Sequence, residues 1–257
     1  MIEIILNSGT EWLVPYDWND ADNSIEAWGG GASGTGINSP KFTDGQPGGG
    51  AGAYCRGDNI PLTPNTTVQV RIGAGPSGTS GTGTAGGATC FNATSLANAV
   101  SNGDTISVAA PGGSQGSGSG AGSTGGPGGI ATNGVGNHTR TSGGNGGNGQ
   151  GNGPSGAGGN SPNGGTGGGS VSAVGTNGNS GNAPGGGGSG ARGSGTRTGG
   201  SGANGRIRIR YEPLVRRGNM FLVFSNVAAT LLSGWSALIG AVGSVFAKRP
   251  VRHQAAV

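Results

Sequence analysis

Residues 143–151, GGNGGNGQG, decide the fold of the central region because glycine recurs in them with a three-residue period. Related pieces follow in GGTGGG (164–169) and PGGGGSG (184–190). Three residues per turn is the polyproline-II geometry, which leaves every backbone N–H and C=O free. Several such helices can bond to one another where glycine lets their backbones approach. The pattern therefore predicts packed glycine helices, whereas collagen is excluded because a strict Gly every third residue and abundant Pro are missing.

The same region cannot build a conventional hydrophobic core. The chain has 65 glycines and only 9% charged residues. Between residues 112 and 205 the large apolar residues are limited to Ile130, Val135, Val171 and Val174. At about 25 cal/mol per Å² of buried apolar surface, four side chains do not hold a domain together. Either backbone hydrogen bonds organise this stretch, or it is a flexible low-complexity linker.

The residues that follow the glycine-rich region favour the ordered alternative. Residues 206–211, RIRIRY, alternate with a two-residue period, which is typical of a strand with one buried face. A strand in this position needs partners, and the nearest candidates precede the glycine-rich region. We therefore expect both ends of the region to join one sheet.

Short apolar or alternating runs before the glycine-rich region predict antiparallel strands separated by turns. The runs are residues 2–6, 12–14, 24–28, 67–72 and 105–109. The fold class predicted is mainly β, with short antiparallel strands sandwiching a packed polyglycine-II-type region, plus one apolar C-terminal α-helix. The predicted parts are a β-rich segment (1–111), the glycine-rich region (112–205), a closing strand of the same domain (206–214) and a helix with basic flanks (215–257).

The C-terminal segment contains thirty residues without a charge, from Gly218 to Ala247, flanked by basic residues on both sides. This length exceeds the roughly 20 residues that cross a bilayer. Three interpretations stay open: a membrane anchor, a helix in an oligomeric virion bundle, and a helical hairpin broken near Ser233. The residues expected to form the anchor or oligomer face are Phe221, Phe224, Leu231, Leu232, Trp235, Leu238, Ile239 and Val242.

Charge and cysteine content narrow the function classes. The net charge is +4, and most acidic residues lie before residue 60, so nucleic-acid binding is not expected. Cys55 and Cys90 are too few for a disulfide framework and are expected to be small buried residues in strands. The N-terminal MIEIILNSG has no basic residue ahead of its apolar run, so we expect no secretory signal.

Catalytic and cofactor motifs are weak. Residues 112–116, GGSQG, match a nucleophile elbow only formally, since no long hydrophobic strand precedes them. The histidines and cysteines lack metal-site spacing, so no cofactor or metal and no enzyme activity are expected. Asp17, Asp20 and Asp22 are interpreted as a solvated turn rather than a cation site. The arginines at 206, 208 and 210 are expected to form a solvent-exposed basic strand face.

Four ordered blocks resemble the glycine-rich domain of tailed-bacteriophage fibre proteins. They are GTEWLVPYDWNDADNSIEAWGGGASG from Gly9, GGGAGAYCRGDNIPLTPNTTVQVRIGAG from Gly48, GGATCFN from Gly86, and GGSGANGRIRIRYE ending at Glu212. The tract between them is similar to the polyglycine-II sandwich of T-even-like distal tip adhesins. The resemblance implies that loops between glycine helices touch a bacterial surface receptor. No aromatic residue lies between Phe91 and Tyr211, which argues against recognition by a protein pocket or by sugar stacking in this tract.

The function expected from this resemblance is that of a virion structural protein at the tip of a tail fibre, assembled in the host cytoplasm and exposed on the virion. Its partners would be a host cell-surface receptor and other virion proteins, with homo-oligomer or membrane contact through the C-terminal helix. The alternatives are a membrane-anchored or helix-bundled capsid or vertex protein of a lipid-containing phage, and a host glycine-rich surface protein. Larger residues that interrupt the glycine repeat, most of them polar, are the candidate receptor contacts: Asn133, Val135, Asn137, His138, Thr139, Arg140, Val174, Thr176 and Asn177. They could equally be surface turns.

Overall fold

Antiparallel β-structure dominates the described part of the chain. The computed structural model describes residues 1–39 and 43–214, and residues 1–214 form one compact unit. One α-helix, α1 (Leu96–Asn102), and one 3₁₀ turn, η1 (Ala131–Asn133), are the helical elements of these residues. The predicted mainly-β class is confirmed.

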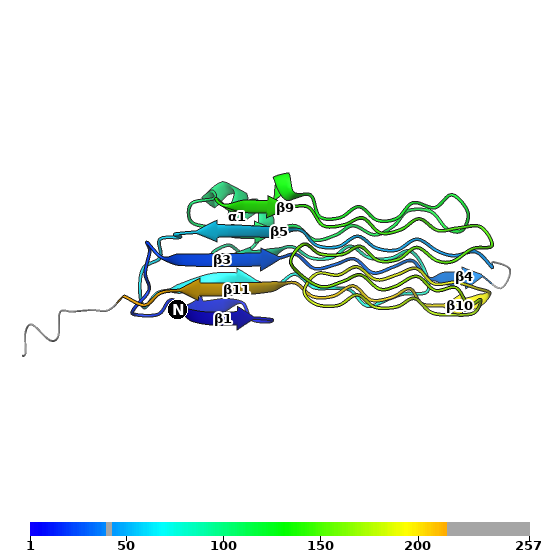
Figure 1. Cartoon of the computed structure of the whole chain (residues 1–257), viewed down its shortest axis with the longest axis horizontal. Coiled ribbons are helices and arrows are strands. Elements are labelled where there is room, and N and C mark those ends of the chain that lie inside the picture. Colours follow the sequence, from blue (N-terminus) through cyan, green and yellow to red (C-terminus); the bar gives the residue numbers. More distant parts are fainter. Residues whose placement is uncertain (40–42, 215–257) are drawn as a thin grey trace, which may run out of the picture. The chain divides into compact units, whose positions relative to one another are not determined.

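Strands from before and after the glycine-rich region meet in one sheet. β11 (Arg206–Tyr211) pairs with β1 (Ile2–Leu6) on one side and with β3 (Asn23–Trp28) on the other. β5 (Tyr54–Asp58) and β9 (Thr139–Thr141) extend the sheet, which has the order β1-β11-β3-β5-β9 (Figure 1). The predicted union of the two ends is therefore confirmed.

Two smaller sheets complete the strand set. The four-stranded sheet has the order β2-β6-β7-β8, and a two-stranded sheet joins β4 to β10. Their bounds are β2 (Glu11–Leu13), β6 (Thr67–Arg71), β7 (Thr89–Phe91), β8 (Val108–Ala110), β4 (Ile37–Ser39) and β10 (Gly195–Arg197). β4 and β10 lie at the opposite end of the unit from the five-stranded sheet (Figure 1).

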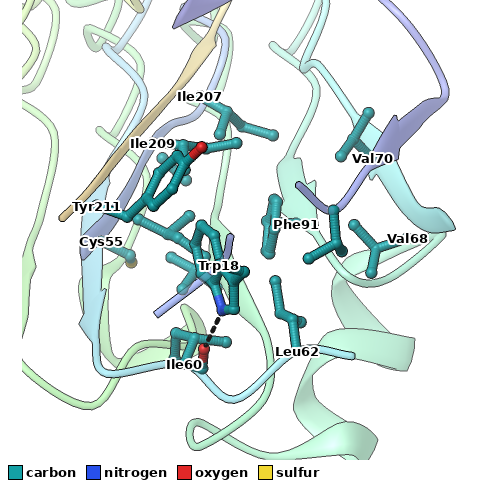
Figure 2. Packing of buried hydrophobic residues seen from close by; sticks show 14 of the residues in the cluster. Trp18, Cys55, Ile60, Leu62, Val68, Val70, Phe91, Ile207, Ile209 and Tyr211 are labelled. Atoms are coloured by element: carbon teal, nitrogen blue, oxygen red, sulfur yellow. Dashed lines mark hydrogen bonds between the residues drawn. The ribbon is translucent and has the colours of Figure 1, made fainter. Parts of the chain in front are cut away.

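The hydrophobic core lies between the five-stranded and four-stranded sheets. Alternation in β11 buries Ile207 and Ile209 while the arginines between them point to the other face. Val70 and Phe91 come from the four-stranded sheet, and Trp18 lies between the two layers (Figure 2). The Trp18 indole donates a hydrogen bond to the Ile60 carbonyl over 3.2 Å, so its one polar group is satisfied inside the core.

The strand predicted over residues 105–109 was placed too early, because β8 begins at Val108. The preceding residues instead follow α1, a helix that the sequence did not predict. The Ser95 hydroxyl accepts a hydrogen bond from the Asn98 amide and starts this helix, and Gly103 ends it with a positive φ of 89°. The turn after Gly103 leaves Ile106 partly exposed, so the alternation of Thr105 and Ile106 does not belong to a strand.

Backbone hydrogen bonds in residues 29–36 follow a three-residue period. The amides of residues 29, 30 and 31 donate to three different neighbouring segments, with the acceptors Ala53, Gly87 and Ala203. The amides of residues 32, 33 and 34 donate to the same segments in the same order, with the acceptors Gly50, Thr84 and Gly200. Each acceptor number falls by three, so every one of these neighbours runs antiparallel to residues 29–36.

Residues 45–53 repeat this arrangement with other neighbours. The amides of residues 48–50 donate in turn to segments around Gly147, Gly188 and Ser114, and residues 51–53 return to the same three segments. Residues 45–53 and 185–191 are buried although they contain few large side chains. The backbone amides are therefore satisfied within the unit without a hydrophobic core at this end.

Close approach of neighbouring carbonyls explains the abundance of glycine. A Cβ placed on Gly34 would lie 1.9 Å from the Ser189 carbonyl oxygen, and one on Gly48 would lie 2.0 Å from the Ala157 carbonyl oxygen. These positions have no room for any side chain. Glycine is thus required here by the contacts between segments rather than by the flexibility of a linker.

The predicted C-terminal helix, residues 218–247, lies outside the described residues. Within residues 1–39 and 43–214, no helix has both the length and the apolar character needed to cross a membrane.

Candidate functional site

The predicted contact residues fall into two separate groups. Residues 133–140 run from the last residue of η1 into β9, the edge strand of the five-stranded sheet. Residues 174–177 lie instead near β10, because Thr176 forms an isolated bridge with Arg192. Figure 1 places β9 and β10 at opposite ends of the unit. The structure therefore does not bring the nine residues into one site.

In the first group, Asn137 holds its segment against β5. Its side-chain oxygen accepts from the Asp58 amide at 2.8 Å, and its side-chain nitrogen donates to the Asp58 carbonyl at 2.8 Å. His138 is exposed, with Nε2 3.5 Å from the Asp58 carboxylate and Nδ1 2.6 Å from the Thr139 hydroxyl. Asn137 thus has a structural role, while His138 presents its ring at the surface.

An open groove of about 920 Å³ lies between α1 and this first group. Asn133 and Arg140 line one side of it, and Val100 of α1 lines the other. Arg140 is held over the segment by a 3.1 Å hydrogen bond from its guanidinium to the Gly134 carbonyl. Val135 is buried in a small core cluster with Ala99 and Ala109, so its side chain is not the surface contact that the sequence predicted.

The second group belongs to a set of turns that we call the distal turns. They are residues 37–39, 79–82, 118–123, 150–154, 171–177 and 192–197, where the glycine-rich segments reverse direction. Hydrogen bonds join them to one another or to the adjoining segments, as between Gly36 and Gly81 and between Gln150 and Gly45. β4 and β10, which belong to this set, mark their position in Figure 1.

Through its guanidinium, Arg192 contacts two of the other distal turns and the Thr43 carbonyl. Nη2 donates to the Asn152 carbonyl at 3.0 Å, and Nη1 donates to the Ser172 carbonyl. Nε lies 3.5 Å from the Thr43 carbonyl. One charged side chain therefore fixes main-chain atoms of segments that are distant in sequence.

The side chains of the 171–177 turn differ in how firmly they are held. Asn177 accepts a 3.0 Å hydrogen bond from the Thr198 amide, which ties it to the end of β10. Thr176 exchanges two backbone hydrogen bonds with Arg192. Val174 is 52% exposed and is the apolar side chain that this turn presents to solvent.

The arginines of β11 are paired, which corrects the expectation of a solvated basic face. The Arg208 guanidinium donates two hydrogen bonds to the buried Glu26 carboxylate, one of them over 2.7 Å to Oε1. Arg210 pairs with Glu3 at 2.6 Å, and Arg206 donates to the Asn7 side chain. This face is therefore a network of cross-strand pairs.

Opposing influences set the pKa of the Glu26 carboxyl. Its burial acts to raise the pKa, but hydrogen bonds from Arg208 and Tyr54, together with the positive charges of Arg208 and Arg210, outweigh burial and hold the pKa below its ordinary value. The Tyr54 hydroxyl donates to Glu26 at 2.7 Å. Because Arg208 and Tyr54 already satisfy the Glu26 carboxylate with hydrogen bonds, its function is structural.

Two aspartates of the acidic N-terminal turn make hydrogen bonds within the unit. Asp20 accepts from the Leu62 amide at 3.0 Å, and Asp17 accepts from the Tyr211 hydroxyl at 3.1 Å. No cluster of three or more His, Cys, Asp or Glu side chains that could hold a metal ion occurs in residues 1–39 and 43–214. The acidic turn thus contributes to the local fold.

The sequence did not identify the distal turns at 79–82 and 118–123 as candidates, because their small residues resemble the surrounding repeat. The available signal was the cluster of hydroxyl side chains in residues 77–84, SGTSGTGT, where the glycine period is interrupted. An interruption of the glycine period of this kind indicates a chain reversal, just as the larger insertions elsewhere in the region do.

A family model described as a glycine-rich domain matches residues 7–212 of this chain. The match includes every strand of both large sheets except β1, and all of the glycine-rich segments. A search of curated proteins found no match.

Proposed function

This chain belongs to the glycine-rich domain family. We propose that it is a structural protein of a bacteriophage virion that forms the host-binding tip of a tail fibre. The four sequence blocks that resemble tail-fibre proteins support this proposal. They extend from Gly9 to Glu212, nearly the span that the family model covers.

We also infer that the glycine-rich segments are polyglycine-II-type helices. The support is the three-residue period with which consecutive amides in residues 29–36 and 45–53 return to the same neighbouring segments. A threefold helix directs successive N–H groups to three sides, as this pattern requires. A strand of a β-sheet would direct them to two.

The proposed mechanism is a rigid scaffold that presents turns. Most contacts within the glycine-rich region are made by main-chain atoms, so the turns can change in sequence while the scaffold stays the same. The observation that carries the proposal is the gathering of the distal turns at one end, where Arg192 links its own turn to the turns at 150–154 and 171–177. Binding residues commonly lie on loops that a rigid frame positions.

Val174 is the side chain that best tests receptor contact at the distal turns, since it is exposed and apolar. We expect Val174→Asp to reduce adsorption of the phage to its host at least tenfold without changing the melting temperature. Val100→Asp is the matched variant at the opposite end, because Val100 is 57% exposed and lines the groove beside residues 133–140. If neither substitution changes adsorption, neither end is the receptor contact and the adhesin proposal fails.

Locating the protein in the virion provides a separate test of the proposal. Gold-labelled antibodies against residues 1–214 should mark the ends of tail fibres in electron micrographs. Labelling of the capsid alone would contradict the fibre-tip assignment.

A second candidate function is that of a membrane-anchored capsid or vertex protein of a lipid-containing phage. The uncharged run from Gly218 to Ala247 with its basic flanks favours it. Extraction of expressing cells with alkaline carbonate distinguishes the two functions. An anchored protein stays with the membrane pellet, whereas release into the supernatant removes this alternative.

A further inference from the structure

A pocket of about 490 Å³ lies between the turn after β1 and strand β6. One wall is formed by residues 7–10 and the other by residues 69–72, and Ala74, Thr94 and Asn204 complete the lining. This volume is within the range of about 300–1,000 Å³ that small-molecule sites occupy. Figure 1 shows β1 at the other end of the unit from β4 and β10, so the pocket is separate from the distal turns.

The pocket exists because the hydrogen-bond ladder between β2 and β6 opens at Gly9. The Val70 amide donates to the Thr10 carbonyl at 2.8 Å, in register with the pairing of the two strands. Hydrogen-bonded pairs recur at every second residue, so the next bond would join the Ile72 amide to the Ser8 carbonyl. This bond is not formed. Gly9 has a φ of 114°, which residues with side chains rarely adopt, and it turns the chain away from β6.

The Ile72 amide is left as an unpaired donor at the pocket. Successive N–H groups of an extended strand point to alternate sides, so the Ile72 N–H points to the same side as that of Val70, toward residues 7–10. No carbonyl of the main chain within residues 1–39 and 43–214 accepts from it. Because a backbone amide without a partner is unfavourable unless water reaches it, a ligand oxygen here would gain a hydrogen bond at little cost.

Arg71 supplies a positive charge at the same wall. Its side chain is exposed, and it is the one arginine of the described chain whose guanidinium has neither a hydrogen bond nor an ion pair. The other seven each donate to a carboxylate, a carbonyl or a side-chain amide. None of the lining residues is acidic, and Glu11, which lies next to this wall in sequence, accepts from the Gln69 side chain at 3.1 Å. The charge of Arg71 is therefore available to a ligand.

Hydrogen bonds hold the polar ends of the pocket in place. The Asn7 side-chain oxygen accepts from Arg206 at 2.8 Å, and the Asn204 side-chain oxygen accepts from the Gly75 amide at 2.7 Å. Both side chains are thus oriented before any ligand arrives. A preformed wall lowers the entropy that is lost on binding.

The chemistry of the lining restricts the ligand. A guanidinium presents its N–H groups in a planar fork that matches a carboxylate. Its single charge balances one negative charge, whereas a phosphate monoester carries nearly two at neutral pH. The hydroxyls of Ser8, Thr10 and Thr94 can each donate or accept, and so match the hydroxyls of a sugar ring.

We propose that this pocket binds a uronic acid, a sugar ring with one carboxylate. The carboxylate would pair with the Arg71 guanidinium and accept from the Ile72 amide, while ring hydroxyls would bond to Ser8, Thr10 and Thr94. The inference goes beyond the proposed attachment function and does not depend on it, because the pocket lies apart from the distal turns.

Titration of the ¹⁵N-labelled full-length protein tests the site directly. The probes are methyl glucuronoside and methyl galacturonoside, each at up to about 50 mM, where a millimolar Kd is measurable. We expect at least one of them to shift the amide signals of residues 8–10 and 69–72, with the largest shift at Ile72. Methyl glucoside and methyl galactoside lack the carboxylate, and acetate lacks the ring, so each should bind at least tenfold more weakly. Added salt should weaken uronoside binding by screening the ion pair.

Arg71→Gln removes the charge and keeps a polar side chain. We expect it to weaken uronoside binding at least tenfold without lowering the melting temperature, because the guanidinium has no partner among the described residues. Arg71→Lys should restore part of the affinity, since it keeps the charge but not the fork. Arg210→Gln is the matched control. It removes the same charge from another strand, where Arg210 pairs with Glu3, and should leave uronoside affinity unchanged.

Three results would overturn the proposal. They are the absence of shifts at the pocket with both uronosides, equal uronoside affinity in the parent protein and in Arg71→Gln, and binding of acetate or of the neutral glycosides as tight as that of the uronosides. Adsorption of the phage is a separate readout. Uronoside binding supports the site even where Val174→Asp and Val100→Asp leave adsorption unchanged, so the failure of one proposal is distinguishable from the failure of the other.

Discussion

Arg208 of β11 and Glu26 of β3 face each other across adjacent strands and form two hydrogen bonds, although 182 residues separate them in the sequence. The Arg208 guanidinium also lies 5.3 Å from the ring centre of Trp28, and the Tyr54 hydroxyl donates to the same carboxylate. This contact joins the strand after the glycine-rich region to the strands before it. It therefore closes the sheet from which the glycine-rich segments extend.

Glu26→Gln should destabilise the protein by about 2 kcal/mol at neutral pH, because Arg208 then faces a neutral group. Since the folded-state pKa of Glu26 lies below the unfolded value, the ionised carboxyl stabilises the fold above the unfolded pKa, and this contribution is lost as the pH falls through the folded pKa. Urea unfolding from pH 7 down to pH 3 should thus show a smaller loss of stability in the variant.

Glu3→Gln is the matched control for this pair. Glu3 binds Arg210 at the surface, where an ion pair contributes less than about 1 kcal/mol. An equal loss of stability in the Glu3 and Glu26 variants would show that burial does not strengthen the ion pair between Arg208 and Glu26.

Gly34→Ala tests the close approach of neighbouring backbones. The new Cβ would lie 1.9 Å from the Ser189 carbonyl oxygen, so the segments must move apart, and we expect a loss of about 3 kcal/mol. Gly169→Ala is the control, because nothing lies within 4 Å of its Cβ position; its effect should stay within about 0.5 kcal/mol. Thermal unfolding of both variants is the measurement. Similar melting temperatures would contradict tight contact between the glycine-rich segments.

The thiols of Cys55 and Cys90 should not react in the folded protein. Burial raises the pKa of Cys55 to about 12 and that of Cys90 to about 11, so both stay protonated at pH 8, and the reactive thiolate is scarce. A thiol reagent with a coloured product should detect neither group before unfolding and both after addition of guanidinium chloride. Rapid reaction of either thiol in the native state would contradict the buried positions in β5 and β7.

Arg192→Met tests whether one side chain holds the distal turns together. The variant keeps an unbranched side chain but loses the hydrogen bonds to Asn152 and Ser172. We expect faster amide exchange in residues 150–154 and 171–177, with no change in the five-stranded sheet. Arg192→Lys should restore the protection only in part, since a single ammonium cannot reach three carbonyls in the geometry of a guanidinium.

Much of the sheet could be predicted because alternation and turn residues are local signals. RIRIRY at 206–211 predicted β11 and its need for partners, and TVQVRI at 67–72 predicted β6, which ends one residue earlier. The helix α1 was missed because LANAVSN is only seven residues long and its start depends on the single cap Ser95. The start of β8 at Val108 was misplaced because α1 was missed: the residues just before Val108 belong to the turn that follows this helix.

The candidate site was less predictable because it is assembled by contacts between distant segments. Glycine periodicity indicated that segments are packed together, but it does not say which segments are neighbours or where each turn lies. Residues 133–140 and 174–177 looked alike in the sequence, yet they lie at opposite ends.

Hydrogen exchange of the backbone amides tests the central claim, that main-chain hydrogen bonds hold the glycine-rich region together. Amides of residues 29–36, 45–53 and 185–191 should exchange at least about 1,000-fold more slowly than those of an unstructured peptide, because they open only with the unit as a whole. Exchange of these amides at the rate of a random coil would contradict the fold of this region and the functions proposed for its turns.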